Sequence, residues 1–269
     1  MLSAADKAWA IFARDARIAI AYPANFWGGW LSIVGQIVTF YFIAKLIGPS
    51  KAYGIAGHPA TYFDYVAVNL AFVRFQNVSI HSFQQAMRGA QMVGTLEALL
   101  ATPTSLSLLI LSSGLWAFTL TILQIVFFLA IALGLGLQLN HVNPITAVAF
   151  LVLTILAMSP IGVLSAASIM TFKQEAPTAM LFGGLGALLG GVLFPVDRLP
   201  HWLQVVSWML PITHSLNGIR GAVAGASVFE LGPDALWLAT LTVVLGPISL
   251  YAFSRAVRRA KEDGTLADY

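Results

Sequence analysis

Polar and cationic side chains recur at helical spacing within one otherwise apolar stretch of this chain. Arg74 is followed by Asn77, His81 and Arg88 at spacings that place all of them on one side of a helix. Arg74 would lie on the order of 18 Å into a bilayer at about 1.5 Å per residue. Because a buried arginine by default marks a functional site, we expect a wet, cationic wall of a substrate path that attracts an anionic group such as a phosphate. In the alternative, the helix ends early and Arg74 reaches the interface or pairs within the helix bundle.

The composition of the chain indicates what kind of element carries this stripe. Of 269 residues, 58% are hydrophobic and only 9% are charged, whereas soluble domains carry about 25% charged residues. Runs of about 20 apolar residues, long enough to cross a bilayer, occur several times. The absence of cysteine excludes disulfides, iron–sulfur clusters and thiolate metal sites. We therefore expect an all-α membrane protein with one transmembrane domain over residues 1–269 and no metal site.

The hydrophobic pattern predicts six membrane-spanning helices. Their approximate ranges are 26–47, 60–81, 103–137, 145–170, 177–194 and 235–254. The second is the weakest, because it contains Asp64, Asn69 and Arg74 along with further polar residues. Between the fifth and the sixth, the chain is too interrupted by proline and charge to span. Two histidines in that interval, His201 and His214, lack the spacing of a metal site and fit an aromatic belt better.

Residues 3–20 are predicted to form an amphipathic helix. At about 100° per residue, Trp9 and Phe12 fall on an apolar side, while Arg14 and Arg17 fall on the opposite one. Such a helix lies in the membrane interface with its aromatic rings in the acyl boundary. A helix packed on a protein partner fits the same pattern.

The placement of lysine and arginine predicts the orientation in the membrane. Nine basic residues fall on the side of the termini and four on the other, with Arg74 set aside as intramembrane. The first group is Lys7, Arg14, Arg17, Arg88, Lys173, Arg255, Arg258, Arg259 and Lys261, and the second is Lys45, Lys51, Arg198 and Arg220. Since cytoplasmic loops are enriched in basic residues, both termini are predicted to be cytoplasmic.

The stretch GTLEALLATPTS, Gly94 to Ser105, interrupts the apolar pattern on the cytoplasmic side. Gly94 can end a helix, and Glu97 suits the first turn of the next one. Thr102 followed by Pro103 is a start signal for the third span. The residues alone predict a short surface helix between the second and third spans, which could be a well-capped connector and nothing more.

Two stretches of the sequence resemble the ABC type-2 exporter permeases. GTLEALLATPTS is similar to a family signature of glycine, threonine, leucine and glutamate that ends in threonine–proline. GGVLFPVDRLPHWLQVVSWMLPITHSLNGIRG is similar to the family's glycine-rich fifth helix, phenylalanine–proline and two short re-entrant outer helices, here about 197–222. The resemblance covers essentially the whole chain. It implies the permease subunit of an ATP-driven exporter in the cytoplasmic (inner) membrane of a prokaryote, with an amphipathic, lipid-like, glycan-linked or drug-like substrate.

The resemblance also implies partners and site residues. Residues of about 84–99 would form a coupling helix that sits in a groove on a separate ABC ATPase subunit. The residues expected to carry this contact are Arg88, Gly94, Thr95, Leu96, Glu97, Leu99 and Leu100. The complete transporter would contain a permease homodimer and two ATPases, with ATP and magnesium bound by the ATPases and no nucleic acid involved. The sequence agrees in lacking a G-x-x-x-x-G-K-[ST] phosphate loop, so we expect no catalytic residue and no cofactor in this chain.

Small residues in the fifth span suggest close helix packing. Gly183, Gly186 and Gly190 belong to a run with small-xxx-small spacing. The resemblance suggests a homodimer contact or a path-lining face, and packing within one subunit fits the residues equally well.

Two other classes of membrane protein compete with this interpretation. An intramembrane enzyme would need a serine with a histidine on a neighbouring helix, and Ser165 has no histidine within a clean span to serve it. A secondary transporter would need inverted repeats or paired broken helices, and the sequence shows no convincing internal repeat.

Overall fold

Helices make up most of the described chain. The computed structural model describes residues 3–48, 53–55, 58–92, 94, 108, 112, 114–139, 141–172, 184 and 186–262. The longer helices are α1 Ala4–Ala21, α2 Pro23–Ile47, α3 Tyr62–Met92, α6 Leu115–Gly134, α7 Pro144–Phe172 and α12 Gly232–Glu262. The shorter elements are β1 Tyr53–Ile55, β2 His58–Ala60, α9 Gly186–Leu189, the 3-10 turn η2 Val196–Arg198, α10 His201–Met209 and α11 Pro211–Val223.

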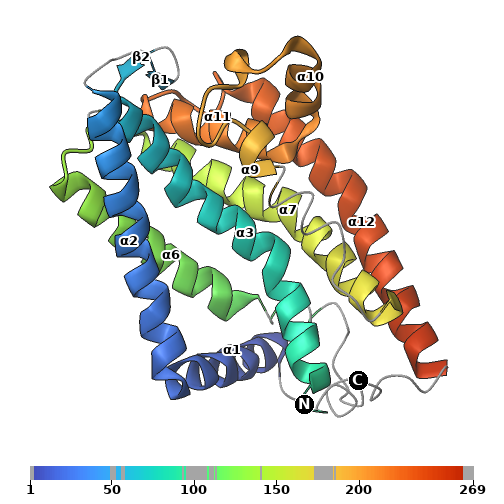
Figure 1. Cartoon of the computed structure of the whole chain (residues 1–269). Helices are drawn as coiled ribbons and strands as arrows, with labels where there is room; N and C mark the ends of the chain where they lie inside the picture. Colours follow the sequence, from blue (N-terminus) through green and yellow to red (C-terminus); the bar gives the residue numbers. More distant parts are fainter. Residues whose placement is uncertain are drawn as a thin grey trace.

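The long helices run between two ends of the molecule (Figure 1). The strands, α9, α10 and α11 gather at one end, which we call the α10–α11 end. Helix α1 lies across the opposite end, which we call the α1 end. The all-α prediction holds for the long elements, and the antiparallel pair β1–β2 adds a small hairpin in the predicted connection between the first and second spans.

Helix α1 starts with a capping box that its sequence encodes. The Ser3 hydroxyl accepts a hydrogen bond from the Asp6 amide, and the Asp6 carboxylate accepts one from the Ser3 amide at 3.0 Å. The Asp6 carboxylate also accepts from the Ser3 hydroxyl at 2.8 Å, and this bond, followed by the one from the Ser3 amide, lowers the pKa of Asp6. At its apolar side, Phe12 stacks on Trp9 and meets the edge of Trp116 in α6 at 5.6 Å. The helix predicted over 3–20 is therefore present over Ala4–Ala21, and its position in a membrane interface stays a prediction.

Among the described residues, four helical segments are long and apolar enough to cross a membrane. They are Pro23–Ile47, Leu115–Gly134, Pro144–Ser168 and Gly232–Arg259. They correspond to the predicted spans 26–47, 103–137, 145–170 and 235–254. The first part of the third predicted span and residues 177–183 and 185 of the fifth, 177–194, lie outside the described residues, and in the rest of the fifth α9 ends at Leu189. The count of six spans is thus a prediction that these helices support in part.

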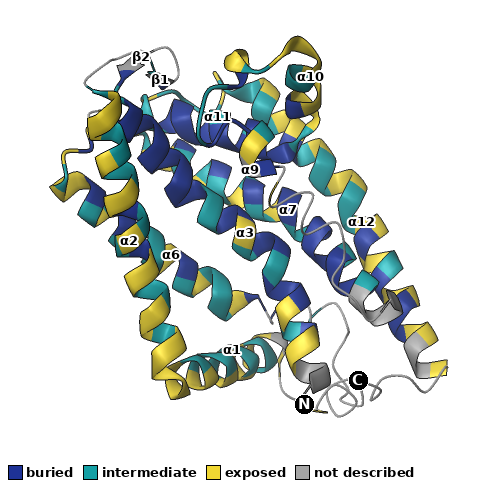
Figure 2. Ribbon diagram, viewed as in Figure 1, coloured by how far each residue is buried: buried dark blue, intermediate teal, exposed yellow. Residues whose placement is uncertain are grey.

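Helix α3 occupies the second predicted span but is more polar than α2, α6 and α7. Its Thr61–Asp64 start is a second capping box, in which the Asp64 amide donates to the Thr61 hydroxyl and the Asp64 carboxylate accepts from the Thr61 amide. Residues 62–72 are all buried, as the dark part of α3 in Figure 2 shows. Polar side chains are tolerated there because protein rather than lipid surrounds them.

The main core lies where α2, α3, α6, α7 and α11 pack together, with Ile37, Phe128 and Leu216 among its buried side chains. Helix α7 runs between α3 and α12 (Figures 1 and 2). Helices α3 and α7 touch most closely at Gly162, where an added Cβ would lie 2.5 Å from the Ser79 carbonyl oxygen. Towards the α1 end the three helices share an apolar cluster that includes Phe83, Ala166 and Phe253. Helices α7 and α12 each carry a proline about midway, at Pro160 and Pro247.

Two short helices, α10 and α11, fill the stretch that was predicted to be too interrupted to span. Pro200 precedes α10, and Pro211 is the first residue of α11, where a missing amide hydrogen is harmless. Helix α11 is almost entirely buried and lies against α7, with the Phe150 ring directly over Gly218. Helix α11 is thus enclosed by protein, whereas α10 keeps exposed side chains such as Trp202 and Met209.

Candidate functional site

Arg74 is a residue of α3, and its side chain contacts α2 and α6. Its Nη2 donates to the Gln36 side-chain oxygen of α2 at 2.5 Å, and its guanidinium carbon is 5.9 Å from the centre of the Phe128 ring of α6. Its Nε is shielded from solvent and has no hydrogen-bond partner among the described residues. The contact with Gln36 is the bundle pairing that the sequence analysis left open, and it leaves part of the hydrogen-bonding capacity of the guanidinium unused.

The other residues of the predicted stripe follow Arg74 along α3. Asn77 and Arg88 are exposed, and His81 is half-buried. The stripe therefore borders the side of α3 that the described chain does not fully cover.

The predicted ATPase-coupling segment is described only at its beginning. Helix α3 continues without a break from the predicted second span to Met92, so the first part of the predicted coupling helix, 84–92, extends α3 rather than forming a helix of its own. Gly94 has φ +69°, a left-handed conformation, which fits its predicted role in ending a helix. The remaining predicted contact residues, Thr95, Leu96, Glu97, Leu99 and Leu100, lie outside the described residues.

The glycines of the fifth predicted span meet neighbours within the chain. An added Cβ on Gly190 would lie 2.5 Å from a methyl group of Ile212 in α11, and one on Gly186 would lie 3.4 Å from the Gln76 amide nitrogen in α3. Gly183 lies outside the described residues. Gly190 thus supports the within-subunit alternative, and a homodimer contact stays a prediction.

A buried arginine that the sequence analysis did not select joins three parts of the chain at the α10–α11 end. Arg220 of α11 donates from Nε to the Asn69 side-chain oxygen and from Nη2 to the Tyr65 hydroxyl, both at 2.9 Å. Nη2 also donates to the carbonyl oxygen of Gly191, which lies just after α9. We call Tyr65, Asn69, Gly191, Val192 and Arg220 the Arg220 cluster.

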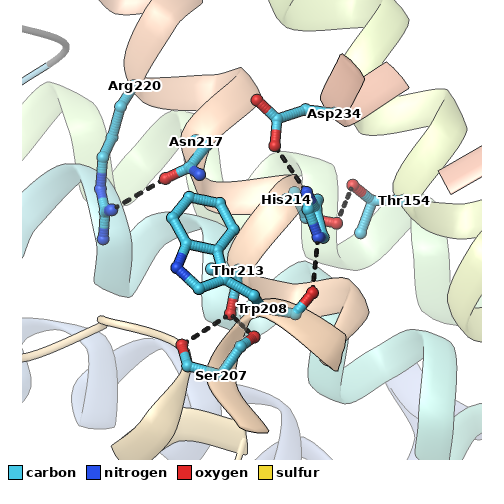
Figure 3. Close-up of polar contacts among 9 residues, drawn as sticks. Thr154, Ser207, Trp208, Thr213, His214, Asn217, Arg220 and Asp234 are labelled. Carbon is cyan, nitrogen blue, oxygen red and sulfur yellow. Dashed lines mark hydrogen bonds and ion pairs between the residues drawn. The ribbon is translucent and has the colours of Figure 1, made fainter. Parts of the chain in front are cut away.

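Further polar contacts tie the short helices together at the same end (Figure 3). The buried Ser207 hydroxyl donates to the Leu189 carbonyl of α9 at 2.6 Å, and the Thr213 hydroxyl donates to the Ser207 carbonyl. His214 contacts the Asp234 carboxylate at the start of α12 at 2.6 Å and donates through Nε2 to the Trp208 carbonyl. His214 therefore connects α10, α11 and α12. Within the described residues, no group of three or more histidine or acidic side chains could hold a metal ion.

A comparison with protein families decides what this helical bundle is. The family model described as ABC-2 type transporter matches residues 8–223. The chain belongs to the ABC-2 type transporter family. The match includes α3, α7, the short helices α9 to α11 and the predicted coupling segment. ABC-2 members are ABC transporter permeases, which are not enzymes themselves, so the family supports a permease rather than an intramembrane hydrolase.

Individual ABC-2 relatives carry names that agree with the family. The chain is 30% identical over 143 residues to nodulation protein J of Rhizobium meliloti, covering 51% of this chain and 52% of the relative. It is 26% identical over 168 residues to the putative transport permease ycf38 of Cyanophora paradoxa, covering 60% and 58%. It is 25% identical over 166 residues to the probable multidrug ABC transporter permease YbhR of Escherichia coli, covering 61% and 45%. The matches span about half the length of these relatives.

Proposed function

We propose that this chain is the transmembrane permease subunit of an ATP-driven ABC exporter. It moves an amphipathic, lipid-like, glycan-linked or drug-like substrate out of the cytoplasm or the inner leaflet. The observation that carries the proposal is the ABC-2 family match over residues 8–223, in a chain whose described part contains four membrane-length helical segments. Two relatives, a probable multidrug ABC transporter permease and a linearmycin resistance permease, support an amphipathic or drug-like cargo.

Energy enters through a separate ATPase in this proposal. ABC-2 permeases work with an ABC ATPase partner, and the sequence of this chain contains no phosphate-loop motif. The contact runs along the end of α3 and the segment after it, from Arg88 through Gly94 to Leu100. Two ATPases, each binding ATP and magnesium, would move these segments in a permease homodimer.

The partner is tested by purifying the tagged permease from its native membrane and measuring magnesium-dependent ATP hydrolysis in the purified sample. We expect a phosphate-loop ATPase to co-purify and to hydrolyse ATP. Glu97→Lys should remove both the ATPase and the activity, because it reverses a charge in the proposed contact. Glu230→Lys, a matched change at an exposed position just before α12, should remove neither. Substrate transport by a permease that never binds an ATPase would disprove the proposal.

The substrate path follows the stripe of Arg74, Asn77 and His81 in this proposal. Arg74 is half-buried, makes one hydrogen bond to Gln36 and keeps a buried Nε without a described partner. A cation in apolar surroundings attracts an anionic group, because water does not screen the charge there. We therefore expect amphipathic substrates with a phosphate or another anionic head group.

Two probes with the same alkyl chain length distinguish the effect of head-group charge from that of hydrophobicity. ATP hydrolysis by the reconstituted complex is measured with dodecyl phosphate and with dodecyl maltoside, both below their micelle concentrations. Dodecyl phosphate should stimulate the parent more strongly, and Arg74→Gln should weaken that stimulation about tenfold, the size expected for one lost charged hydrogen bond. Arg74→Lys should retain part of it, and exposed Arg198→Gln should retain all of it. An equal response to both probes in the parent would rule out the anionic preference.

Orientation and assembly complete the proposal. Both termini face the cytoplasm of a prokaryotic cell, the protein is multi-pass in the inner membrane, and the α10–α11 end is the outer one. The basic residues near the termini support this orientation. Two copies associate along the fifth span, with Gly183 and Gly186 near the contact.

A further inference from the structure

The hydrogen bonds of the Arg220 cluster are of a kind that can break and re-form. Arg220 is 7% exposed, and every described hydrogen bond that it makes goes to a neutral acceptor, namely an amide, a phenol or a carbonyl oxygen. No ion pair of Arg220 is found within the described residues. Asp197 acts on the Arg220 charge only from beyond direct contact, and a buried guanidinium whose hydrogen bonds all go to neutral groups is an expensive way to hold a fold together. Such a group is better explained by a requirement for a strong but breakable directional contact.

The cluster converges on one backbone oxygen. The Gly191 carbonyl accepts from Arg220, from the Tyr65 hydroxyl at 2.5 Å and from the Asn69 amide at 3.4 Å, while Asn69 also donates to the Val192 carbonyl at 2.9 Å. Gly191 has φ +77°, and an added Cβ would lie 2.9 Å from Val196. Only glycine therefore presents its carbonyl here without strain. The segment at Gly191–Val192 is attached to α3 by these hydrogen bonds, while the Val192 side chain packs in the apolar core.

The position of the cluster links it to transport. Helix α3 carries the Arg74 stripe, and Gly191 lies just after α9, near the end of the predicted fifth span, 177–194. The first is the proposed wall of the path, the second belongs to a span that was expected to form a dimer contact or a path-lining face, and Arg220 joins them at the proposed outer end. We infer that Arg220 is a positioning residue that holds the exit of the path closed, and that release of the Gly191 carbonyl from Tyr65, Asn69 and Arg220 opens it. This inference rests on the proposed export function.

A single cysteine reports the opening directly. The chain contains no cysteine, and Val192 is 1% exposed, so Val192→Cys introduces one buried thiol beside the cluster with little change in volume. The complex with its ATPase is placed in membrane vesicles. A membrane-impermeant maleimide is added on the side of the α10–α11 end, with and without ATP. We expect slow labelling without ATP and faster labelling with it.

Variants of the cluster should remove that dependence on ATP. Arg220→Lys keeps the charge but loses the forked geometry, so labelling without ATP should become about tenfold faster, as expected for one lost charged hydrogen bond, and ATP should add little. Tyr65→Phe should accelerate labelling in the same way by a smaller factor. The double variant should be no faster than Arg220→Lys, because both changes release the same carbonyl.

Two controls separate opening from general loosening. Ser215→Ala removes the buried Thr154–Ser215 hydrogen bond between α7 and α11 but leaves the cluster intact, so labelling should stay ATP-dependent. Arg198→Lys repeats the arginine substitution at an exposed position of the same end. If Arg220→Lys labels at the parent rate, or if ATP is hydrolysed without any change in labelling of the parent, the inference is wrong while the exporter function stands. Absence of any bound ATPase would instead overturn the proposed function, and the labelling without ATP would still report whether Arg220 closes this end.

Discussion

Apolar side chains pack at both ends of the helical bundle, but the two ends differ in the polar contacts that accompany this packing. At the α10–α11 end, side-chain hydrogen bonds connect segments that are distant in sequence, as in Arg220 with Asn69, Ser207 with Leu189 and His214 with Asp234. Towards the α1 end, α3, α7 and α12 meet through apolar side chains such as Phe83 and Phe253. This difference affects how the helices at each end can move. Hydrogen bonds hold one geometry and break when it changes, whereas apolar surfaces keep much of their contact as they slide.

The largest expected effect tests whether the packing of α3 against α7 depends on their close approach at Gly162. Gly162→Ala would bring a Cβ to 2.5 Å from the Ser79 carbonyl oxygen, which is backbone and cannot move aside. We expect a loss of about 3 kcal/mol in stability, the upper part of the usual range for overpacking, measured as thermal unfolding in detergent. Gly35→Ala in α2, where nothing lies within 4 Å, should cost nothing. Equal stability of the two variants would show that α3 and α7 separate without cost.

The next effect tests the hydrogen-bonded end. Ser207→Ala removes the donor to the Leu189 carbonyl, whose 2.6 Å bond is buried, and should cost about 1–2 kcal/mol of thermal stability. Ser32→Ala is the control, because that exposed hydroxyl bonds only to Gly29 of its own helix. If both serines are equally dispensable, directional bonds do not hold the α10–α11 end.

A smaller effect is expected where α3 begins. Asp64 caps α3 and also accepts from the Gln138 amide, in the segment after α6, at 3.0 Å. Asp64→Ala should cost about 1 kcal/mol, the usual value of a lost cap. It should also raise the hydrogen-exchange rate of the Gln138 amide. Asp64→Asn, which keeps an acceptor oxygen, should restore most of the protection, and an unchanged rate in the alanine variant would contradict the contact.

The smallest effect concerns the exposed start of α1. Because the folded-state pKa of Asp6 is lowered by Ser3, the stabilisation from this cap is present above the ordinary pKa of an aspartate and is lost as pH falls through the lowered value. In Ser3→Ala the pKa of Asp6 should rise towards its ordinary value, so the helix start frays at a higher pH. A carboxyl ¹³C titration of Asp6 measures its pKa in the parent and in the variant. Identical titrations in parent and variant would contradict the cap.

Local patterns in the sequence were enough for much of the fold. Apolar runs gave four of the long helices, and the Ser3-x-x-Asp6 spacing is a readable helix start. The same spacing at Thr61-x-x-Asp64 could have been read as a cap, although Asp64 counted there as a weakness of the second span. Gly94 was correctly expected to suit the end of a helix.

The candidate sites show where sequence reasoning stops. Arg74 stood out because it interrupts an apolar run, but its partner Gln36 lies on another helix and no local spacing connects them. Arg220 was counted with the basic residues outside the membrane, whereas the structure buries it against Asn69 and Tyr65, which are 151 and 155 positions earlier. Contacts over such distances depend on how the helices pack, which composition and periodicity do not encode.

The midway prolines of α7 and α12 have a consequence for shape change. Each proline lacks the amide hydrogen that would bond to the carbonyl four residues earlier, at Leu156 and at Val243, so each helix has a weak point there. The two helices start at the same end (Figure 1), and the prolines come 16 and 15 residues after Pro144 and Gly232, so the weak points lie at a similar distance along each helix. Both helices can therefore flex at one common level, which lets the half towards the α1 end swing while the half at the α10–α11 end keeps its shape.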